Sequence, residues 1–188
     1  MFRRDLVSRI QPNPGHHALV ALESLLPEVV VLTQNIDGLH REAGSGDVVE
    51  LHGNIWRYKC FDNCRGTPTI VDLESLEYDD EKPPPCPHCG AHVRPDVVWF
   101  GENLPARALN RAYEVSQGCD VMLVVGTSGV VQPAASIPYY ARQAGAAVID
   151  VNPVPGEISP LADVFLQGPS GEVLPRLVEA VRDLQAES

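Results

Sequence analysis

The chain has 188 residues, which is enough for one domain or one and a half and for a substantial buried core. Apolar residues make up 44% and charged residues 21%, so the composition is that of a folded globular protein and excludes global disorder. The net charge of -11 would repel a phosphate backbone, and no apolar run approaches the roughly 20 residues that a membrane helix requires. We therefore expect neither nucleic acid nor a membrane as a direct partner.

The first third of the chain begins an alternation of helices and strands. The pattern predicts a helix over residues 18–26, closed by Pro27, and a strand at residues 29–33. That strand is a short run of β-branched residues, which is typical of parallel sheets covered on both faces. Residues 53–104 interrupt the alternation, because they are rich in Cys, Pro and acidic residues and show no helical period. We interpret them as an insert.

Beyond the insert the alternation resumes and continues to the end of the chain. It predicts helices at residues 105–117, 133–144 and 171–184, and strands at residues 121–125, 147–151 and 164–166. This order predicts an α/β fold with a Rossmann-like, doubly wound parallel sheet. The predicted domains are a sheet domain at residues 1–52 and 105–188, and the insert at residues 53–104.

Four cysteines of the insert occur as two close pairs. Cys60 and Cys64 are separated by three residues, Cys86 and Cys89 by two, and 21 residues lie between the pairs. Two short Cys loops with this spacing are typical of a zinc ribbon, in which four thiolates surround one ion. Because protein ligands then fill every position, no site remains for an activated water. The sequence therefore predicts one structural Zn²⁺.

Alternatives to this metal site remain open at the level of the sequence. The four cysteines would otherwise be buried thiols or disulfides, and either His88 or His92 would replace one cysteine ligand. Cys119 stands alone before an apolar strand and is expected to be an ordinary core residue. Zinc-binding thiolates indicate a reducing compartment, which fits the cytoplasm, the nucleus and the mitochondrial matrix equally.

Polar residues follow four of the predicted strands, at the point where each strand ends. These segments are Gln34 to His40, Gly126 to Gly129, Asn152, and Gly168 to Gly171. In open α/β sheets, ligands bind beyond the carboxyl ends of the strands. Small residues let backbone N–H groups approach phosphates, while amides and Asp37 can bind ribose hydroxyls. The four segments together predict a shared nucleotide site.

His52 is the strongest candidate for proton transfer. It lies where the predicted sheet domain gives way to the insert, and a domain junction is a common place for a cleft. An imidazole titrates near neutral pH and suits general base catalysis, although a structural histidine is the simpler alternative. His16, His17 and His40 are weaker candidates, because no acid or base partner lies near them in the sequence.

Taken together, these motifs resemble the sirtuin family of NAD-dependent protein deacylases. The resemblance covers essentially the whole chain, and the motifs stand in the family's order. The stretches at residues 97–104 and 165–169 are more similar to the branch that removes succinyl or malonyl groups. The segments that carry the resemblance are Thr33 to His40, Leu51 to Asn54, the two cysteine pairs, Arg94 to Glu102 and Val125 to Ser128.

The resemblance implies a role for each of the polar segments. It implies that NAD is the cofactor, that His52 is the base, and that Asn35 and Asp37 are the most sensitive neighbours of the reaction. The acyl group of an acyl-lysine would pass to ADP-ribose while nicotinamide leaves. The cofactor contacts that it implies are Gln34, Asn35, Ile36 and Asp37 at the nicotinamide and ribose end, Gly126, Thr127 and Ser128 at phosphate and ribose, and Asn152 and Ser170 at the adenosine half.

The resemblance also implies how substrate binds. Val98 and the segment Gly129 to Val131 would flank an extended acyl-lysine peptide that pairs as an added strand, a mode that accepts many sequences around one lysine. Arg3 falls at the position of an arginine that binds acidic acyl groups in the family, and a surface arginine is an equal alternative. We expect protein or peptide substrates and a monomer.

One departure from the family bears on activity. The family's sheet opens with a Gly-Ala-Gly-x-Ser turn that holds the pyrophosphate, and neither this turn nor the following Phe-Arg loop occurs in the sequence. We therefore expect a sheet that lacks its first βα unit, and weak or absent turnover by the 188-residue chain alone. Two other functions stay open: a zinc-stabilised module that binds a peptide or protein, and a protein ADP-ribosyltransferase.

Overall fold

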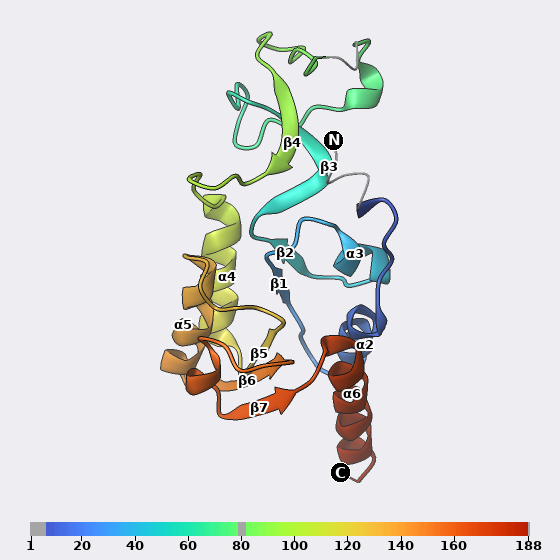
Figure 1. Ribbon diagram of the computed structural model, residues 1–188, viewed down its shortest axis with the longest axis vertical. Coiled ribbons are helices and arrows are strands. Elements are labelled where there is room, and N and C mark those ends of the chain that lie inside the picture. The colour runs from blue at the N-terminus through green and yellow to red at the C-terminus, as the bar shows by residue number, and fades with distance from the viewer. Residues whose placement is uncertain (1–6, 79–81, 188) are drawn as a thin grey trace. The chain divides into compact units, whose positions relative to one another are not determined.

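A computed structural model describes residues 7–78 and 82–187, and the chain divides into two compact units (Figure 1). The first, which we call the cysteine unit, comprises Thr33–Gly38 and Glu50–Pro105 together with residues 7–10. The second, the sheet unit, comprises Gln11–Leu32, Leu39–Val49 and residues 106–187. The insert that the sequence predicts at residues 53–104 lies within the cysteine unit.

A parallel sheet forms the centre of the sheet unit. Its strands are β5 (Val121–Val125), β6 (Ala147–Asn152) and β7 (Val164–Gln167), which lie side by side in that order (Figure 1). In register, Val125 pairs with Val151, and Asn152 pairs with Gln167. The parallel strands predicted at residues 121–125, 147–151 and 164–166 are therefore confirmed, and their carboxyl ends meet at one edge, whereas the strand predicted at residues 29–33 pairs outside this sheet.

Four helices accompany this sheet. They are α2 (Pro14–Glu23), α4 (Ala106–Gly118), α5 (Ile137–Ala144) and α6 (Ser170–Glu187), with a 3-10 turn at Ala134–Ser136 before α5. Helix α2 begins earlier than the predicted residue 18, because the Asn13 side chain accepts hydrogen bonds from two backbone N–H groups and Pro14 fits the first turn. Helix α5 ends at Gly145, whose φ of 106° suits a left-handed C-cap.

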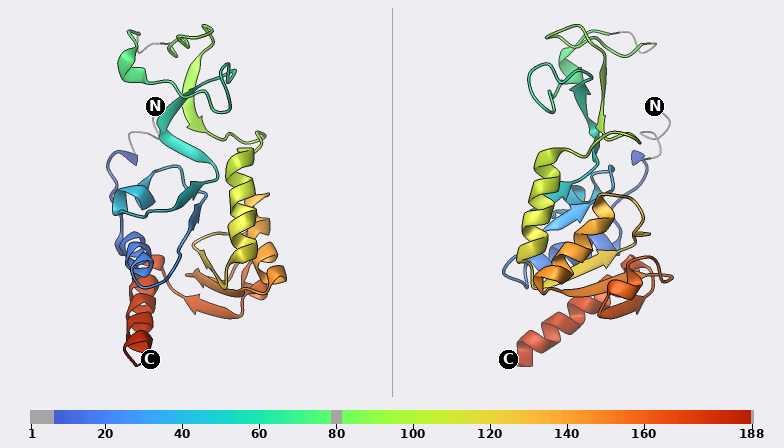
Figure 2. Two further views of the ribbon diagram at one scale, coloured as in Figure 1. Left: turned by 180° about the vertical axis from the view of Figure 1, so that it is seen from behind. Right: turned by 90° about the vertical axis from the view of Figure 1, so that its left-hand side faces the viewer.

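The sheet is covered on both faces, as its apolar strands require. On one face, Val151 packs with Ala18 and Leu22 of α2 and with Leu174 and Val178 of α6. On the other face, Val124 and Val148 pack against Ile158. Helices α4 and α5 pack against each other, as Figure 2 shows. The sheet unit is therefore held by two apolar clusters, one on each face of the sheet.

The cysteine unit is built on one antiparallel strand pair. Strand β3 (Gly53–Cys60) pairs with β4 (Val93–Val97), with Gly53 opposite Val97 and Cys60 opposite Val93. The register shifts between Asn54 and Tyr58, which bends β3. The sequence analysis predicts no strand at residues 53–60, because this segment mixes polar and aromatic residues without strict alternation.

Short elements connect the two units along the chain. They are β1 (Val31–Thr33), α3 (Leu39–Ala43) and β2 (Val48–Glu50), and β1 pairs with β2. The Val31 N–H donates to the Asp47 carbonyl at 2.9 Å, and the Leu51 N–H donates to the Thr33 carbonyl at 2.9 Å. None of the helices in the described ranges is both long enough and apolar enough to cross a bilayer.

Candidate functional site

The four paired cysteines converge on one point of the cysteine unit. Their sulfurs lie within 4.8 Å of one another, with 3.5 Å between the Cys60 and Cys89 sulfurs and 3.8 Å between those of Cys64 and Cys86. Zinc–sulfur bonds of about 2.3 Å in a tetrahedron place the sulfurs about 3.8 Å apart. The donor set therefore fits one zinc ion, with two sulfurs from each close pair.

The alternatives to a cysteine-bound zinc are not supported. All five cysteines are free thiols, and the sulfur separations exceed the 2.05 Å or so of a disulfide bond. In the described ranges, the cluster contains neither His88 nor His92. Backbone N–H groups, first that of Cys64, lower the pKa of Cys60 to about 7, whereas desolvation and contacts with the other thiols raise the pKa of Cys64 to about 12. Because a metal-binding cysteine is deprotonated, all four would be thiolates only with a cation among them.

His52 immediately precedes β3, where β4 approaches most closely. At Gly53 the φ is +78°, and a Cβ would lie 2.0 Å from the Asp96 carbonyl oxygen, so only glycine fits. The Val98 N–H donates to the His52 carbonyl at 3.0 Å. Val98 lies one residue beyond the end of β4. The backbone of the predicted base is therefore held by the segment that follows β4.

The loop from Gln34 to Gly38 is held by the first residues of β3. The Ile55 N–H donates to the Ile36 carbonyl at 2.8 Å, and the Trp56 indole N–H donates to the Asp37 carbonyl at 2.7 Å. His52 also makes a hydrogen bond with the Gln34 backbone. The cysteine unit thus brings the predicted base and the predicted nicotinamide loop together on one strand.

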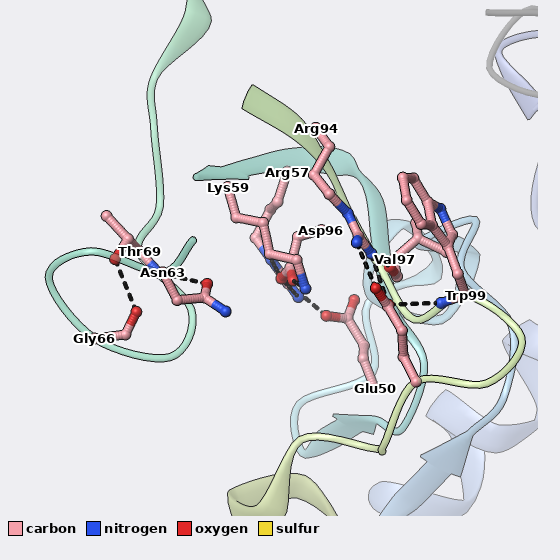
Figure 3. Close-up of polar contacts among 11 residues, drawn as sticks. Glu50, Arg57, Lys59, Asn63, Gly66, Thr69, Arg94, Asp96, Val97 and Trp99 are labelled. Carbon is pink, nitrogen blue, oxygen red and sulfur yellow. Dashed lines mark hydrogen bonds and ion pairs between the residues drawn. The ribbon is translucent and has the colours of Figure 1, made fainter. Parts of the chain in front are cut away.

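Arg94 holds the segment beyond β4 from inside the unit (Figure 3). Its guanidinium donates to both carboxylate oxygens of Glu102, at 2.5 and 2.8 Å, and to the Val97 carbonyl at 2.6 Å. It also lies 3.6 Å from the centre of the Trp99 ring. The paired Arg94 holds the pKa of Glu102 at about 2, well below its usual range. This clamp fixes Val97 to Trp99, the segment whose N–H at Val98 binds His52.

A second charged network lies between β3 and β4. Asp96 is buried and accepts from Arg57 at 3.1 Å and from Lys59 at 3.1 Å, while Arg57 also pairs with Glu50 (Figure 3). Asn54 donates to the same Glu50 at 2.7 Å. These pairs join both strands to the residues that flank His52.

The sheet unit has its own hollow at the carboxyl ends of β5 and β6. Its volume is about 360 Å³, and Gly126, Thr127, Ser128 and Asn152 line it together with residues 154–157. Gly126 has a φ of +63°, and no atom lies within 4 Å of the position of a Cβ there, so its backbone is open to a ligand. The structure thus brings together four of the residues that the sequence analysis assigns to NAD.

Other predicted residues lie elsewhere or are not described. Ser170 begins α6 directly after β7 and is not among the residues that line the hollow. Arg3 lies outside the described residues. Cys119 is half-buried, and its thiol donates to the Ser116 carbonyl at 3.3 Å. These assignments to cofactor and substrate stay predictions.

Two residues near these sites were missed by the sequence analysis. Trp56 holds the Asp37 carbonyl, and Asp150 lies fully buried beneath the hollow of the sheet unit. A carboxylate inside the apolar run Val148 to Val151 is a signal that the sequence contains. Trp56 carries no such signal, because nothing local marks its partner 19 positions away.

A sequence profile described as the Sir2 family matches residues 1–133. The chain is 52% identical over 181 residues to NAD-dependent protein deacylase 2 of Pyrobaculum aerophilum, covering 96% of this chain and 70% of that protein. It is 49% identical over 184 residues to the NAD-dependent protein deacylase of Pyrococcus abyssi, covering 97% of this chain and 73% of that protein.

Solved structures of similar proteins show the same fold. A mutant Sir2 homologue in complex with ADP-ribose superposes with a TM-score of 0.88 at 41% identity, covering 100% of this chain and 73% of that one. A Sir2 homologue in complex with NAD gives a TM-score of 0.84 at 42% identity, covering 95% and 68%. A Sir2 protein bound to a myristoylated histone peptide gives 0.79 at 44% identity, covering 95% and 75%.

Proposed function

Since the chain belongs to the Sir2 family, we propose that it uses NAD to remove acyl groups from the lysine side chains of proteins. The acyl group passes to ADP-ribose, and nicotinamide is released. The observation that carries this proposal is the attachment of His52 and the loop from Gln34 to Asp37 to the same end of β3. A base and a polar loop held on one strand suit a reaction at a single ribose.

His52 has the protonation state that a general base requires. Burial lowers the pKa of His52, and the hydrogen bond with the Gln34 backbone opposes this only in part. The imidazole is therefore neutral at neutral pH and can accept a proton. Its Nδ1 atom is buried, and within the described residues it has no hydrogen-bond partner. A buried ring nitrogen without a partner is what a site completed by a ligand leaves behind.

NAD, when bound, supplies a glycosidic bond to nicotinamide that can be broken. In the proposal, Asn35 and Asp37 orient the nicotinamide ribose, and His52 accepts a proton from one of its hydroxyls. Gly126, Thr127 and Ser128 offer backbone groups to phosphate and ribose, and the position of Gly126 leaves room for that approach. Asn152 and Ser170 complete the adenosine half.

Acylated peptides or proteins are the proposed substrates. Val98 is tied by its N–H to the carbonyl of His52, so the segment proposed to flank the peptide is joined to the base. The exposed Trp99 and Phe100 follow it directly and offer apolar surface to an acyl-lysine. We propose that the acyl group is succinyl, malonyl or acetyl. Arg3, the residue expected to bind an acidic acyl group, lies outside the described residues, so all three groups enter the test. The cysteine-bound zinc supports action in a reducing compartment.

The test is incubation of the full chain with NAD and matched acetyl-lysine, succinyl-lysine and malonyl-lysine peptides. Because the sequence lacks the family's Gly-Ala-Gly-x-Ser turn, we expect slow release of nicotinamide and slow formation of acylated ADP-ribose, both measured by mass spectrometry. His52→Ala should abolish both products, whereas His17→Ala in α2 should abolish neither. Peptide binding without NAD affinity would favour a binding module, and label retained on protein from NAD would favour ADP-ribosyl transfer. Either result would contradict deacylation.

A further inference from the structure

Asp150 is a completely buried carboxylate in the middle of β6, at 0% exposure. Its neighbours in the strand, Ile149 and Val151, belong to the apolar core. A carboxylate in such a place is costly unless hydrogen bonds satisfy both oxygens. One oxygen accepts from the Asn152 amide at 2.7 Å, and the other accepts from the Ser159 hydroxyl at 2.5 Å.

The first of these bonds fixes the orientation of Asn152. The amide nitrogen of Asn152 donates to Asp150 and also to the Thr127 carbonyl at 3.3 Å. Both of its N–H groups are thereby used, since a primary amide has two. Asn152 lines the hollow at the strand ends, so the group it can offer to a ligand there is its amide oxygen, which accepts hydrogen bonds.

The second bond fixes the loop on the other side of the hollow. Ser159 donates to Asp150 and accepts from the Gly156 N–H at 2.8 Å, and Gly156 lines the hollow. Ile158, between Gly156 and Ser159 in the chain, is 1% exposed. It packs so closely against Gly129 that a Cβ at Gly129 would lie 2.6 Å from the Ile158 side chain. Asp150 therefore connects to both walls, the Gly126 to Gly129 turn through Asn152 and the loop through Ser159.

We propose that Asp150 is the positioning residue of this hollow. It holds the Asn152 amide oxygen toward the ligand, and it keeps the loop at residues 156–159 at a fixed distance from the Gly126 to Gly129 turn. This inference rests on the proposed function, because the ligand is the ADP-ribose portion of NAD. The prediction is that the hollow recognises a donor group of the ligand, such as a hydroxyl. A purely structural role predicts instead that loss of Asp150 lowers stability and leaves ligand affinity of the folded protein unchanged.

Two substitutions at Asp150 separate these roles. Asp150→Asn keeps the volume but presents both a donor and an acceptor, so that the Asn152 amide can take either orientation. Asp150→Ala removes the hydrogen-bond acceptor of both Asn152 and Ser159. Circular dichroism checks that this variant is folded. Asp163→Asn is the control, because Asp163 is likewise bonded to β6, accepting from the Val148 N–H at 2.9 Å, but it pairs with Arg142 and precedes β7 at the other end of the strands.

The measurement is titration calorimetry of the full chain with ADP-ribose, together with steady-state kinetics. We expect the dissociation constant for ADP-ribose to rise about tenfold in Asp150→Asn. It should rise about threefold in Ser159→Ala, which breaks only the bond from Asp150 to the loop, and it should not change in Asp163→Asn. We expect KM for NAD to rise in parallel while kcat and KM for peptide stay within about twofold. Unchanged affinity in both Asp150 variants would overturn the inference, as would an equal loss in Asp163→Asn.

A second readout does not depend on turnover. The side-chain amide protons of Asn152, observed by NMR, should exchange slowly with water in the original chain and rapidly in Asp150→Ala. Retained protection in Asp150→Ala would overturn the inference even in a chain that deacylates peptides. If the original chain binds no ADP-ribose and releases no nicotinamide, the proposed function fails and the inference fails with it. If the original chain is active and the Asp150 variants keep their affinity for ADP-ribose, the inference alone is refuted.

Discussion

The two units of this chain are stabilised in different ways. The sheet unit has an apolar cluster on each face of its sheet, in which Val148, Val151 and Leu174 are at most 1% exposed. Among the described residues of the cysteine unit, one buried cluster has four members, two of which, Cys60 and Cys86, are predicted metal ligands. Because hydrophobic stabilisation scales with buried apolar area, we expect the metal and the charged pairs to contribute a larger share of the stability in the cysteine unit. Each unit should therefore respond to a different kind of change.

The buried charged side chains of the two units also have different kinds of partner. In the cysteine unit, buried Arg94 and Asp96 belong to ion pairs that join strands and loops. In the sheet unit, buried Asp150 is satisfied by an amide and a hydroxyl. Charged pairs of the first kind respond to pH and to charge substitutions, whereas an apolar core responds to lost volume.

Metal removal should give the largest effect and should separate the units. A structural zinc site contributes on the order of 10 kcal/mol to its local fold, so a strong chelator or Cys86→Ser should unfold the cysteine unit. Hydrogen exchange, read separately for each unit, should show lost protection around β3 and β4 and retained protection in β5 to β7. Cys119→Ser is the control and should keep one zinc per chain. Full protection of β3 and β4 without metal would break the comparison.

His52→Ala should remove activity with little change in the stability of either unit, because the fold loses one hydrogen bond, to the Gln34 backbone. Loss of a general base costs roughly 10²- to 10⁴-fold in rate, and His52 contributes no ion pair in the described residues. Nicotinamide release measures the first expectation, and thermal unfolding measures the second. Activity within tenfold of the original chain would remove His52 from its proposed role.

Loss of core volume should affect the sheet unit alone. Leu174→Ala, at a side chain that is 1% exposed, should reduce the free energy of unfolding by about 2 to 5 kcal/mol. Leu184→Ala on the same helix is the control, because Leu184 is 65% exposed and should cost no more than about 0.5 kcal/mol. Zinc content should be unchanged in both variants. Equal losses at the two positions would contradict the position of the core.

Breaking the Arg94 clamp should destabilise the cysteine unit moderately. The lowered pKa of Glu102, about 2 against an ordinary 4.5, means that its stabilising contribution is complete above pH 4.5 and disappears as the pH falls toward 2. At pH 7, Glu102→Gln should cost about 1 to 2 kcal/mol, reduced from the value for a buried pair because Glu102 is 37% exposed. Urea unfolding measures this, with exposed Glu74→Gln as control. No difference between the two variants would show that the clamp is not stabilising.

The smallest expected effect is on the pH dependence of activity. Because burial lowers the pKa of His52, the neutral base persists below the ordinary histidine pKa of 6.5. The acid limb of kcat/KM should therefore have its midpoint below pH 6.5, with activity rising through it as the pH increases. A midpoint above 6.5 would indicate that a different group, or a charged His52, controls the reaction.

The sequence by itself determined the elements whose signals are local. Apolar runs predicted β5 to β7, helical periods predicted α4 to α6, and two close cysteine pairs predicted the metal site. Each signal lies within a few residues, because a strand covered on both faces or a metal-binding loop imposes its requirement on neighbouring positions. The motif order was likewise sufficient to identify the family.

Only the tertiary structure decided which of these residues meet. The register shift in β3, the bond from Trp56 to Asp37, and the clamp of Arg94 on Glu102 join segments with no common pattern. The same is true of Asp150, whose presence the sequence marks but whose partners Asn152 and Ser159 it does not. Hydrogen bonds and ion pairs depend on distance and direction in space, and those are set by how the chain packs rather than by the spacing of residues along it.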